Sequence, residues 1–453
     1  MINKHLNVTF SHIFYCVILL TYFVLMSMNA PRSNILIYSQ NAFVVIFSGY
    51  NLFVRKDLYP FSLYKIFYLF SLFFFGITPL LQYKFNAQYW GMGYIPDEYY
   101  IRSYFSLIPV LLIYNYAYIY LGKKNEGSNC LYNFFDYSKK HINGRLHFSK
   151  KAILILVFLF ICCFWGTLYI CNFSISNLAF KGKYDHFHLK LIQPMELFFC
   201  YFIRPFCLIL FLFYCLLGKN NYYKILLFLL SSSIILPTAT PRHMAGILYI
   251  AVLLIGFDFF RKKNILSYSL TGGILYIFPL LNQTRYLTFT KFDFSFNPKF
   301  FISGHFDSFF SYIQITNHEV ITWGKQLLGV IFFYVPRSLW PTKPIGSGYY
   351  YSEQLGDRAR NIAVNYFAEG YINFGYLGIL LFTILITYFC VIFDNTYWRK
   401  DCLINKNGFT ILYYLSFGLL FFVLRDSLMS ATAYTISLYS VVFMINCILK
   451  YVK

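Results

Sequence analysis

The stretch VPRSLWPTKPIGSGYYYSEQLGDRARNIAVNYFAEGYINFGYLG, residues 335–378, is the one long polar interval in a chain made mainly of apolar spans. Its prolines and glycines exclude a single continuous helix. Seven charged residues lie within it, namely Arg337, Lys343, Glu353, Asp357, Arg358, Arg360 and Glu369. A chain this apolar that collects its charges in one irregular segment is expected to keep its chemistry there.

Composition defines the class of protein. Of the 453 residues, 58% are hydrophobic and 12% are charged, and the mean hydropathy is +0.55. A soluble chain of this length could not bury so much apolar surface, whereas a bilayer requires spans of about 20 apolar residues. The sequence therefore predicts an all-α polytopic membrane protein with about 12 transmembrane helices, near residues 8–29, 34–54, 61–82, 102–121, 152–171, 196–217, 224–240, 243–260, 264–281, 376–393, 409–424 and 430–449.

The positions of the basic residues decide how the net charge of +21 is interpreted. With the N-terminus in the cytoplasm, every strongly basic short loop falls on the cytoplasmic side, as the positive-inside rule requires. The C-terminus falls on that side too. We interpret the basic excess as topology and contact with anionic membrane lipids rather than nucleic-acid binding. The basic loops carry Arg55, Lys56, Lys123, Lys124, Lys139, Lys140, Arg145, Lys150, Lys151, Arg261, Lys262, Lys263, Arg399, Lys400 and Lys406.

The sequence gives no sign of a metal site or a cofactor. Nearly all of the eleven cysteines lie in apolar spans or inner loops, so we expect neither disulfides nor a metal centre. The inner loop at 122–150 contains no phosphate-binding glycine loop and no nucleotide fingerprint. The first apolar stretch is too long for a signal-peptide core and is expected to remain as a span.

Four arginines recur at the outer membrane boundary, where the positive-inside rule disfavours them: Arg242, Arg285, Arg337 and Arg425. An arginine at a helix end either extends to lipid headgroups or points into a cavity, and a single residue does not decide between these readings. Taken together, the four indicate phosphate binding, because the planar guanidinium binds phosphate oxygens through two parallel hydrogen bonds. A lipid-linked pyrophosphate is the expected substrate.

Four motifs of the C-terminal half resemble a known family. They are TPRHMAG around Arg242, VPRSLWPTKP from 335 to 344, EGYINFGYLG from 369 to 378, and LRD around Arg425. These are similar to the signatures of the bacterial oligosaccharide repeat-unit polymerases, the Wzy-type O-antigen polymerases. The resemblance covers about residues 230–430, and the first half matches in hydropathy alone.

The resemblance implies a GT-C-like membrane glycosyltransferase of lipopolysaccharide or capsular polysaccharide synthesis in the bacterial inner membrane. Residues 1–281 would hold helices 1–9, residues 282–375 a large extracytoplasmic loop with the active site, and residues 376–453 helices 10–12. The enzyme would transfer the growing glycan from undecaprenyl pyrophosphate to the next lipid-linked repeat unit, without a cofactor. Partners would be membrane lipids, the undecaprenyl-pyrophosphate-linked oligosaccharide, and a chain-length regulator and a flippase of the same pathway.

Roles for single residues follow from the same resemblance. Arg242, Arg285, Arg337 and Arg425, with Lys343 as an auxiliary cation, would bind the pyrophosphate. Glu369 would accept the proton of the acceptor hydroxyl, or alternatively form a structural salt bridge to one of these arginines. Asn373 would hold a turn or contact sugar, and Trp340 would stack on a sugar face or belong to the interfacial aromatic belt. Gly370, Gly375 and Gly378 are expected to let helix and loop approach closely.

Two other functions share these features. An O-antigen ligase-type transferase would use the same lipid donor with the lipid core as acceptor. A lipid-linked glycan flippase would have the same number of spans and the same basic inner loops, but should show two similar halves and ionisable residues buried within spans.

Overall fold

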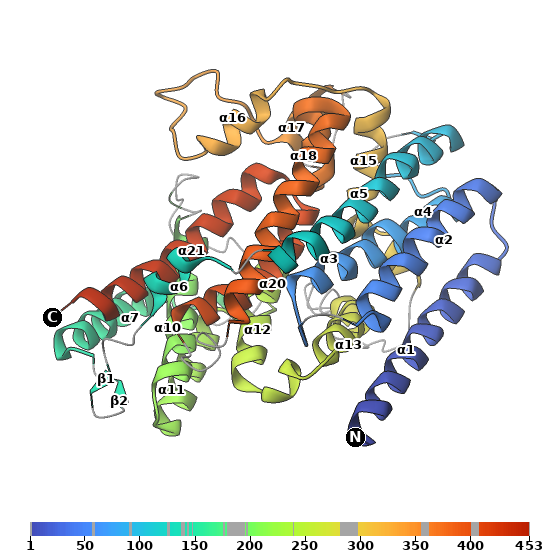
Figure 1. Ribbon diagram of the computed structural model, residues 1–453. Coiled ribbons are helices and arrows are strands. Elements are labelled where there is room, and N and C mark those ends of the chain that lie inside the picture. The colour runs from blue at the N-terminus through green and yellow to red at the C-terminus, as the bar shows by residue number, and fades with distance from the viewer. Residues whose placement is uncertain are drawn as a thin grey trace.

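The structure of this chain is a computed structural model that describes residues 2–56, 59–89, 93–124, 127–136, 141–142, 145–146, 148–174, 177–178, 195, 198–238, 240–280, 298–354, 362–399 and 407–452. Within these ranges nine helical segments are long and apolar enough to cross a membrane. The described chain is otherwise made of shorter helices, connections and one antiparallel pair of two-residue strands. The prediction of a helical polytopic membrane protein is confirmed (Figure 1).

The first part of the chain supplies five of these long segments, two of which include π-helical turns, labelled η1 and η2. Its elements are α1 (Ile2–Ser27), α2 (Ile35–Gly49), η1 (Tyr50–Val54), α3 (Leu63–Ser71), η2 (Leu72–Ile77), α4 (Thr78–Lys84), α5 (Asp97–Lys124), α6 (Asn129–Phe135), β1 (His141–Ile142), β2 (Arg145–Leu146) and α7 (Lys150–Ile170).

The second part supplies the other four long segments and the short helices at one end of the bundle (Figure 1). Its elements are η4 (Phe199–Ile203), α10 (Arg204–Leu217), α11 (Asn221–Ile234), α12 (Arg242–Gly256), η5 (Asp258–Arg261), α13 (Ile265–Gly272), η6 (Gly273–Ile277), η7 (Pro298–Ile302), η8 (Gly304–Phe306), α15 (Ser308–Asn317), α16 (Lys325–Ile331), α17 (Ser347–Gln354), α18 (Tyr366–Tyr397), α20 (Gly408–Arg425) and α21 (Leu428–Tyr451).

The nine long segments overlap nine of the predicted spans. The predicted boundary at 375/376 is wrong, because α18 begins at Tyr366, within the segment expected to belong to the outer loop. The other three predicted spans, 224–240, 243–260 and 264–281, overlap the shorter helices α11, α12 and α13 with η6. At 1.5 Å per residue, a helix of about 15 residues reaches roughly 22 Å, less than the hydrocarbon thickness of about 30 Å. The total of twelve spans therefore remains a prediction.

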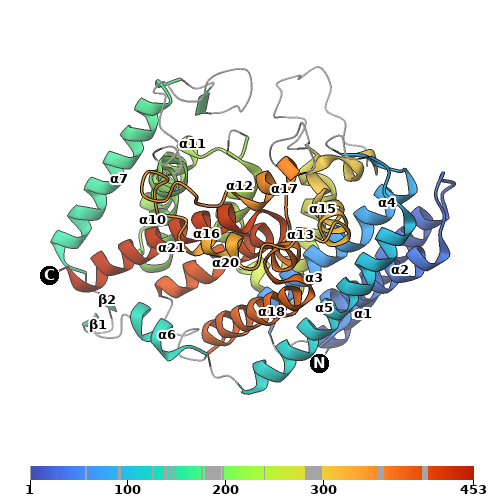
Figure 2. The same ribbon diagram turned by 90° about the horizontal axis from the view of Figure 1, so that it is seen from above.

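The core lies around two helices. Of the residues in the most apolar stretch of each segment, 94% are buried in the span formed by α3, η2 and α4 and 83% in α20. In α7 the buried share is 17%. The central span is rich in phenylalanine and tyrosine, whose rings contact those of neighbouring helices: Phe67 stacks on Tyr114, and Phe70 meets Phe421 edge to face. By contrast, α7 lies at the edge of the bundle (Figure 2) and presents large apolar side chains outward, both aliphatic and aromatic, as expected for a helix that faces lipid.

The predicted outer loop contains ordered helical structure in its described part. Nine of the ten residues of α15 are buried, because the run from Phe309 to Ile315 is largely apolar and packs between α5 and α18. The short helices α16 and α17 lie at the same end of the bundle (Figure 1). Prolines and glycines separate these short helices, as predicted for the stretch 335–378.

Helix α18 has a break that shapes this end. Phe374 (φ −145°, ψ 24°) and Gly375 (φ 61°, ψ −146°) leave the helical conformation, and the second is tolerated because glycine lacks a Cβ. A Cβ on Gly378 would lie 1.9 Å from the carbonyl oxygen of Gly370, so the backbone on the two sides of the break is in direct contact. At Gly370 and Gly378 the close approach is therefore between two segments of α18, and not between a helix and the loop as predicted.

Candidate functional site

The connection between α20 and α21, residues 425–428, is where several predicted site residues meet. Glu369, on the first segment of α18, accepts hydrogen bonds at Oε1 from the Leu428 backbone N–H at 2.9 Å and the Ser427 hydroxyl at 3.4 Å. Its Oε2 accepts a hydrogen bond from the Ser347 hydroxyl at 2.7 Å. Leu428 is the first residue of α21, so the carboxylate lies at a helix N-terminus, where unpaired N–H groups and the helix dipole stabilise negative charge.

The long polar loop packs onto the same connection. A Cβ on Gly346 would lie 3.5 Å from the Ser427 hydroxyl, and one on Gly329 would lie 2.9 Å from Met429 and 3.0 Å from Pro344. Ser347, the first residue of α17, adds the hydrogen bond to Glu369. The loop, the first segment of α18 and the start of α21 therefore form one packed unit.

The side chains of Arg337 and Lys343 each bind backbone carbonyls in the part of the loop that surrounds the other residue. The Arg337 guanidinium donates hydrogen bonds to the Lys343 carbonyl at 2.7 Å and to the Pro344 carbonyl at 3.2 Å. The Lys343 ammonium donates to the carbonyls of Phe333 at 2.5 Å and Val335 at 2.9 Å. Burial, and secondly the charge of Arg337, lower the pKa of Lys343 from its ordinary value. Two cations are thus fixed next to each other by backbone carbonyls.

Arg425, the last residue of α20, connects this helix to the start of α15. Its Nε donates a hydrogen bond to the His305 carbonyl at 3.1 Å, and its Nη2 lies 3.6 Å from Oδ1 of Asp307. The Asp307 side chain is only 3% exposed, whereas that of Arg425 is 28% exposed. The ion pair fixes the base of the guanidinium and leaves part of it accessible.

Arg242 lies at the same end of the bundle, at the start of α12. Its guanidinium carbon is 4.9 Å from the centre of the Phe278 ring, and that ring is 6.1 Å from the His305 ring. The next residue, His243, stacks on Phe422 with ring centres 4.3 Å apart. Because Phe422 is three residues before Arg425, these contacts place the beginning of α12 beside the end of α20.

The remaining predicted site residues divide into three cases. Arg285 lies outside the described residues. The Trp340 indole N–H donates to the Thr342 hydroxyl at 3.1 Å. Asn373 is fully buried; its Oδ1 accepts from the Leu327 N–H at 2.7 Å and its Nδ2 donates to the Glu369 carbonyl at 2.9 Å. These bonds tie the N-terminus of α16 to the segment just before the α18 break.

The site combines cations that hydrogen bonds hold in place, namely Arg337, Lys343 and Arg425, with the buried carboxylate of Glu369. An arginine has five N–H donors and a lysine three, so the bonds described for Arg337, Lys343 and Arg425 leave further donors for an anion. The carboxylate of Glu369 is fully buried, and both of its oxygens accept hydrogen bonds, none of which comes from an arginine. A proton-accepting role would require this packed unit to open, and that role stays a prediction.

Sequence reasoning missed several partners of these residues. Ser347, Ser427, His305 and Asp307 were not among the predicted site residues. Ser427 did carry a signal, since serine directly before a long apolar helix is typical of an N-cap. Its side chain nevertheless makes no capping bond, and its hydroxyl donates instead to Glu369, which also binds the first N–H of α21 from 59 residues away. Nothing local in the sequence indicates such a contact.

The fold defines the class of this chain as a multi-pass helical membrane protein. Among the described residues, no group of three or more histidine, cysteine, aspartate or glutamate side chains is placed to hold a metal ion. No protein-family model, curated protein or solved structure matches the chain.

Proposed function

We propose that this chain is a Wzy-type oligosaccharide repeat-unit polymerase of the bacterial cytoplasmic membrane. It transfers the growing glycan from undecaprenyl pyrophosphate to a hydroxyl of the next lipid-linked repeat unit, on the outer side of the membrane. The observation that carries the proposal is the gathering of Arg242, Arg337, Lys343 and Arg425 at one end of the bundle, from three separate parts of the chain.

Charge development in the reaction explains why such cations are needed. The glycosyl–oxygen bond to the pyrophosphate breaks, the acceptor oxygen forms the new bond to the sugar carbon, and the acceptor proton passes to a base. Negative charge grows on the departing pyrophosphate, and prearranged N–H donors stabilise it more strongly in a partly dry site than in water. Under this proposal the cations bind the pyrophosphate, Arg285 joins them, and Glu369 is the base.

The proposed topology has twelve spans in a GT-C-like arrangement, with both termini in the cytoplasm. It is supported by a concentration of basic residues at the other end of the protein, where Arg55, Lys56 and Lys123 line one cavity and Lys263 shares a second cavity with Arg55 and Lys56. Basic residues that collect at one end indicate the cytoplasmic side. The site described above then lies outside.

The test is complementation of a strain that lacks this chain, scored by the glycan ladder on a gel and by the amount of protein in membranes. A polymerase deletion leaves single repeat units on the lipid core, whereas loss of a ligase leaves the core bare while lipid-linked polymer accumulates. Loss of a flippase retains unpolymerised lipid-linked units on the cytoplasmic side. A normal ladder in the deletion strain would disprove the proposal.

Substitutions then test the pyrophosphate site itself. Arg337→Lys and Arg242→Lys keep the charge but lose the planar fork, so each is expected to shorten the glycan severely at unchanged protein abundance. Arg102→Lys, outside the motifs, is the matched control and is expected to leave the ladder unchanged. If lysine functions as well as arginine at both positions, the pyrophosphate assignment is wrong even though the polymerase activity stands.

A further inference from the structure

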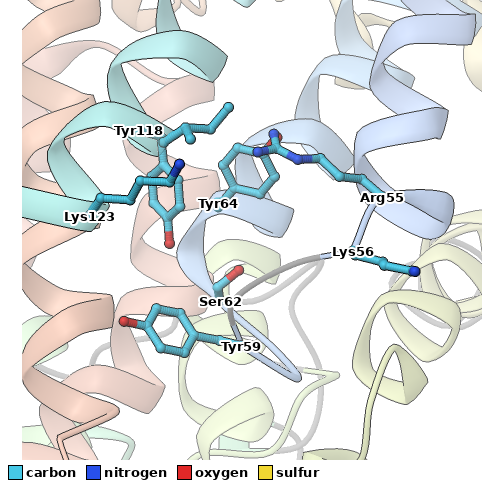
Figure 3. Close-up of a pocket in the computed structure, with 8 residues that line it drawn as sticks. Arg55, Lys56, Tyr59, Ser62, Tyr64, Tyr118 and Lys123 are labelled. Carbon is cyan, nitrogen blue, oxygen red and sulfur yellow. The ribbon is translucent and has the colours of Figure 1, made fainter.

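A cavity of about 160 Å³ lies at the basic end of the protein, away from the site described above (Figure 3). It is lined by Arg55, Lys56, Tyr59, Ser62, Tyr64, Tyr118, Ile119 and Lys123. None of these eight residues is acidic. A single water needs roughly 15 Å³ by the same kind of measure, so the cavity has room for a group much larger than one water.

Three cations line this cavity, and each has N–H donors that no described group accepts. Arg55 uses Nη1 for bonds to Asn51, Tyr64 and Asn115, and its Nε and Nη2 donate to no group in the described part of the chain. Lys123 and Lys56 form no ion pair or hydrogen bond with any described residue. Arg55, which directly follows η1, and Lys123, in the last turn of α5, come to the cavity from different segments, and Lys56 is directed away from them in Figure 3.

A buried hydroxyl in the wall of this cavity has no partner. The Ser62 side chain is 2% exposed, and its Oγ makes no hydrogen bond in the described protein. Ser62 is the N-cap residue of α3, a position where serine normally binds the first free N–H groups of the helix. Here it does not bind them, and its hydroxyl lies in the cavity wall without a partner among the described residues.

Asp394, near the end of α18, explains why Ser62 is not used as a cap. Its carboxylate accepts hydrogen bonds from the N–H groups of Leu63 at 2.9 Å and Tyr64 at 3.4 Å. It also accepts from the hydroxyls of Tyr118 at 2.6 Å and Tyr413 at 2.5 Å. Asp394 is fully buried and does not line the cavity, and its carboxylate oxygens are hydrogen-bonded by these four donors.

We propose that this cavity binds a phosphate group, held by Arg55 and Lys123 and by a hydrogen bond from the Ser62 hydroxyl. The lining offers what a phosphate requires, namely cations, a guanidinium with free N–H donors and neutral hydroxyls. The phosphate comes either from an anionic membrane lipid or from a soluble phosphate. This site is separate from the proposed pyrophosphate site, and neither proposal depends on the other.

The experiment uses the full chain purified in a neutral detergent. Binding of phosphatidylglycerol, phosphatidylcholine and inorganic phosphate is measured by titration at constant ionic strength. Lys123→Gln and Ser62→Ala are each expected to weaken binding about tenfold, the usual effect of losing one hydrogen bond to a charged group. Neither change removes a bond within the described protein, so both variants are expected to fold.

Lys124→Gln is the matched control, since Lys124 is also exposed at the end of α5 and does not line the cavity. It is expected to change binding less than about twofold. Binding of phosphatidylglycerol alone, with this pattern of variants, identifies a lipid headgroup; the same pattern with inorganic phosphate identifies a soluble ligand. Absence of binding by both probes, or equal losses in Lys123→Gln and Lys124→Gln, overturns the proposal.

Discussion

The buried carboxylate of Glu369 binds the backbone N–H of Leu428 at 2.9 Å and so caps α21 from a distant part of the sequence. The same carboxylate holds Ser347 of the long loop. One side chain therefore joins three segments that each contribute to the proposed site. Substitution of Glu369 should therefore have a measurable effect on the stability of the protein.

Replacing Glu369 by glutamine is expected to destabilise the protein by about 2 kcal/mol, because a charge-assisted set of hydrogen bonds is replaced by weaker neutral ones. Alanine is expected to cost about 3 kcal/mol or more, since it also leaves a buried N–H without an acceptor. Thermal unfolding in detergent measures both changes. Glu353→Gln, at an exposed position in α17, is the control and should have an effect within about 0.5 kcal/mol.

The same variants separate a structural role of Glu369 from a catalytic one. If Glu369 is the general base, Glu369→Gln should abolish polymerisation even in protein that is still folded at the assay temperature. If Glu369 is only a helix cap, activity should fall in proportion to the folded fraction. Full activity in a folded Glu369→Gln protein would remove this residue from the chemistry.

The break in α18 predicts a strong effect of adding single methyl groups. Gly375→Ala places a Cβ at φ 61° and ψ −146°, a conformation that alanine does not tolerate. Gly378→Ala drives its Cβ against the Gly370 carbonyl. Each is expected to lose more than about 2 kcal/mol or to reduce membrane abundance sharply. Gly246→Ala in α12, where a Cβ meets nothing within 4 Å, should be neutral or slightly stabilising.

The contact of Arg425 with Asp307 is testable by a double-mutant cycle. Arg425→Gln and Asp307→Asn are each expected to destabilise the protein, and the double variant should lose less than the sum, with a coupling of about 1 kcal/mol or more. Melting temperatures of the four proteins give this coupling energy. Additive effects would mean that the 3.6 Å approach contributes no specific attraction.

The reciprocal bonds of Arg337 and Lys343 predict how the loop responds to proteolysis. Lys343→Met removes both bonds to the Phe333 and Val335 carbonyls, so cleavage within 332–346 is expected to accelerate several-fold. Lys325→Met, at an exposed position at the start of α16, should leave the rate unchanged. Equal cleavage rates in the two variants would show that Lys343 does not order the loop.

Topology is testable without reference to function. Reporter fusions after Asn143 and Lys406 should report a cytoplasmic location, and a fusion after Ser352 an external one. The reason is the distribution of basic loops between the two sides. A cytoplasmic result at Ser352 would place the arginine cluster on the wrong side for the proposed reaction.

The sequence allowed the positions of the helices to be predicted well, because a run of apolar residues long enough for a bilayer is a local property. The contacts within the candidate site could be predicted less well from the sequence. Its place in the motif EGYINFGYLG singled out Glu369, but its bond to Leu428 depends on how α18 and α21 pack. The burial of α15 was likewise missed, because a short apolar run within a polar region does not reveal which helices cover it.

Helix α18 carries a buried carboxylate near each end, and each one caps a different helix. Glu369 binds the start of α21, and Asp394 binds the start of α3. Sliding α18 along its axis would uncap both partners at once, which makes such a motion costly. The backbone departs from helical geometry at Phe374 and Gly375, between the two carboxylates. A rotation of the first segment about Gly375 would therefore break only the Glu369 bond to α21 and leave the Asp394 bond to α3 intact.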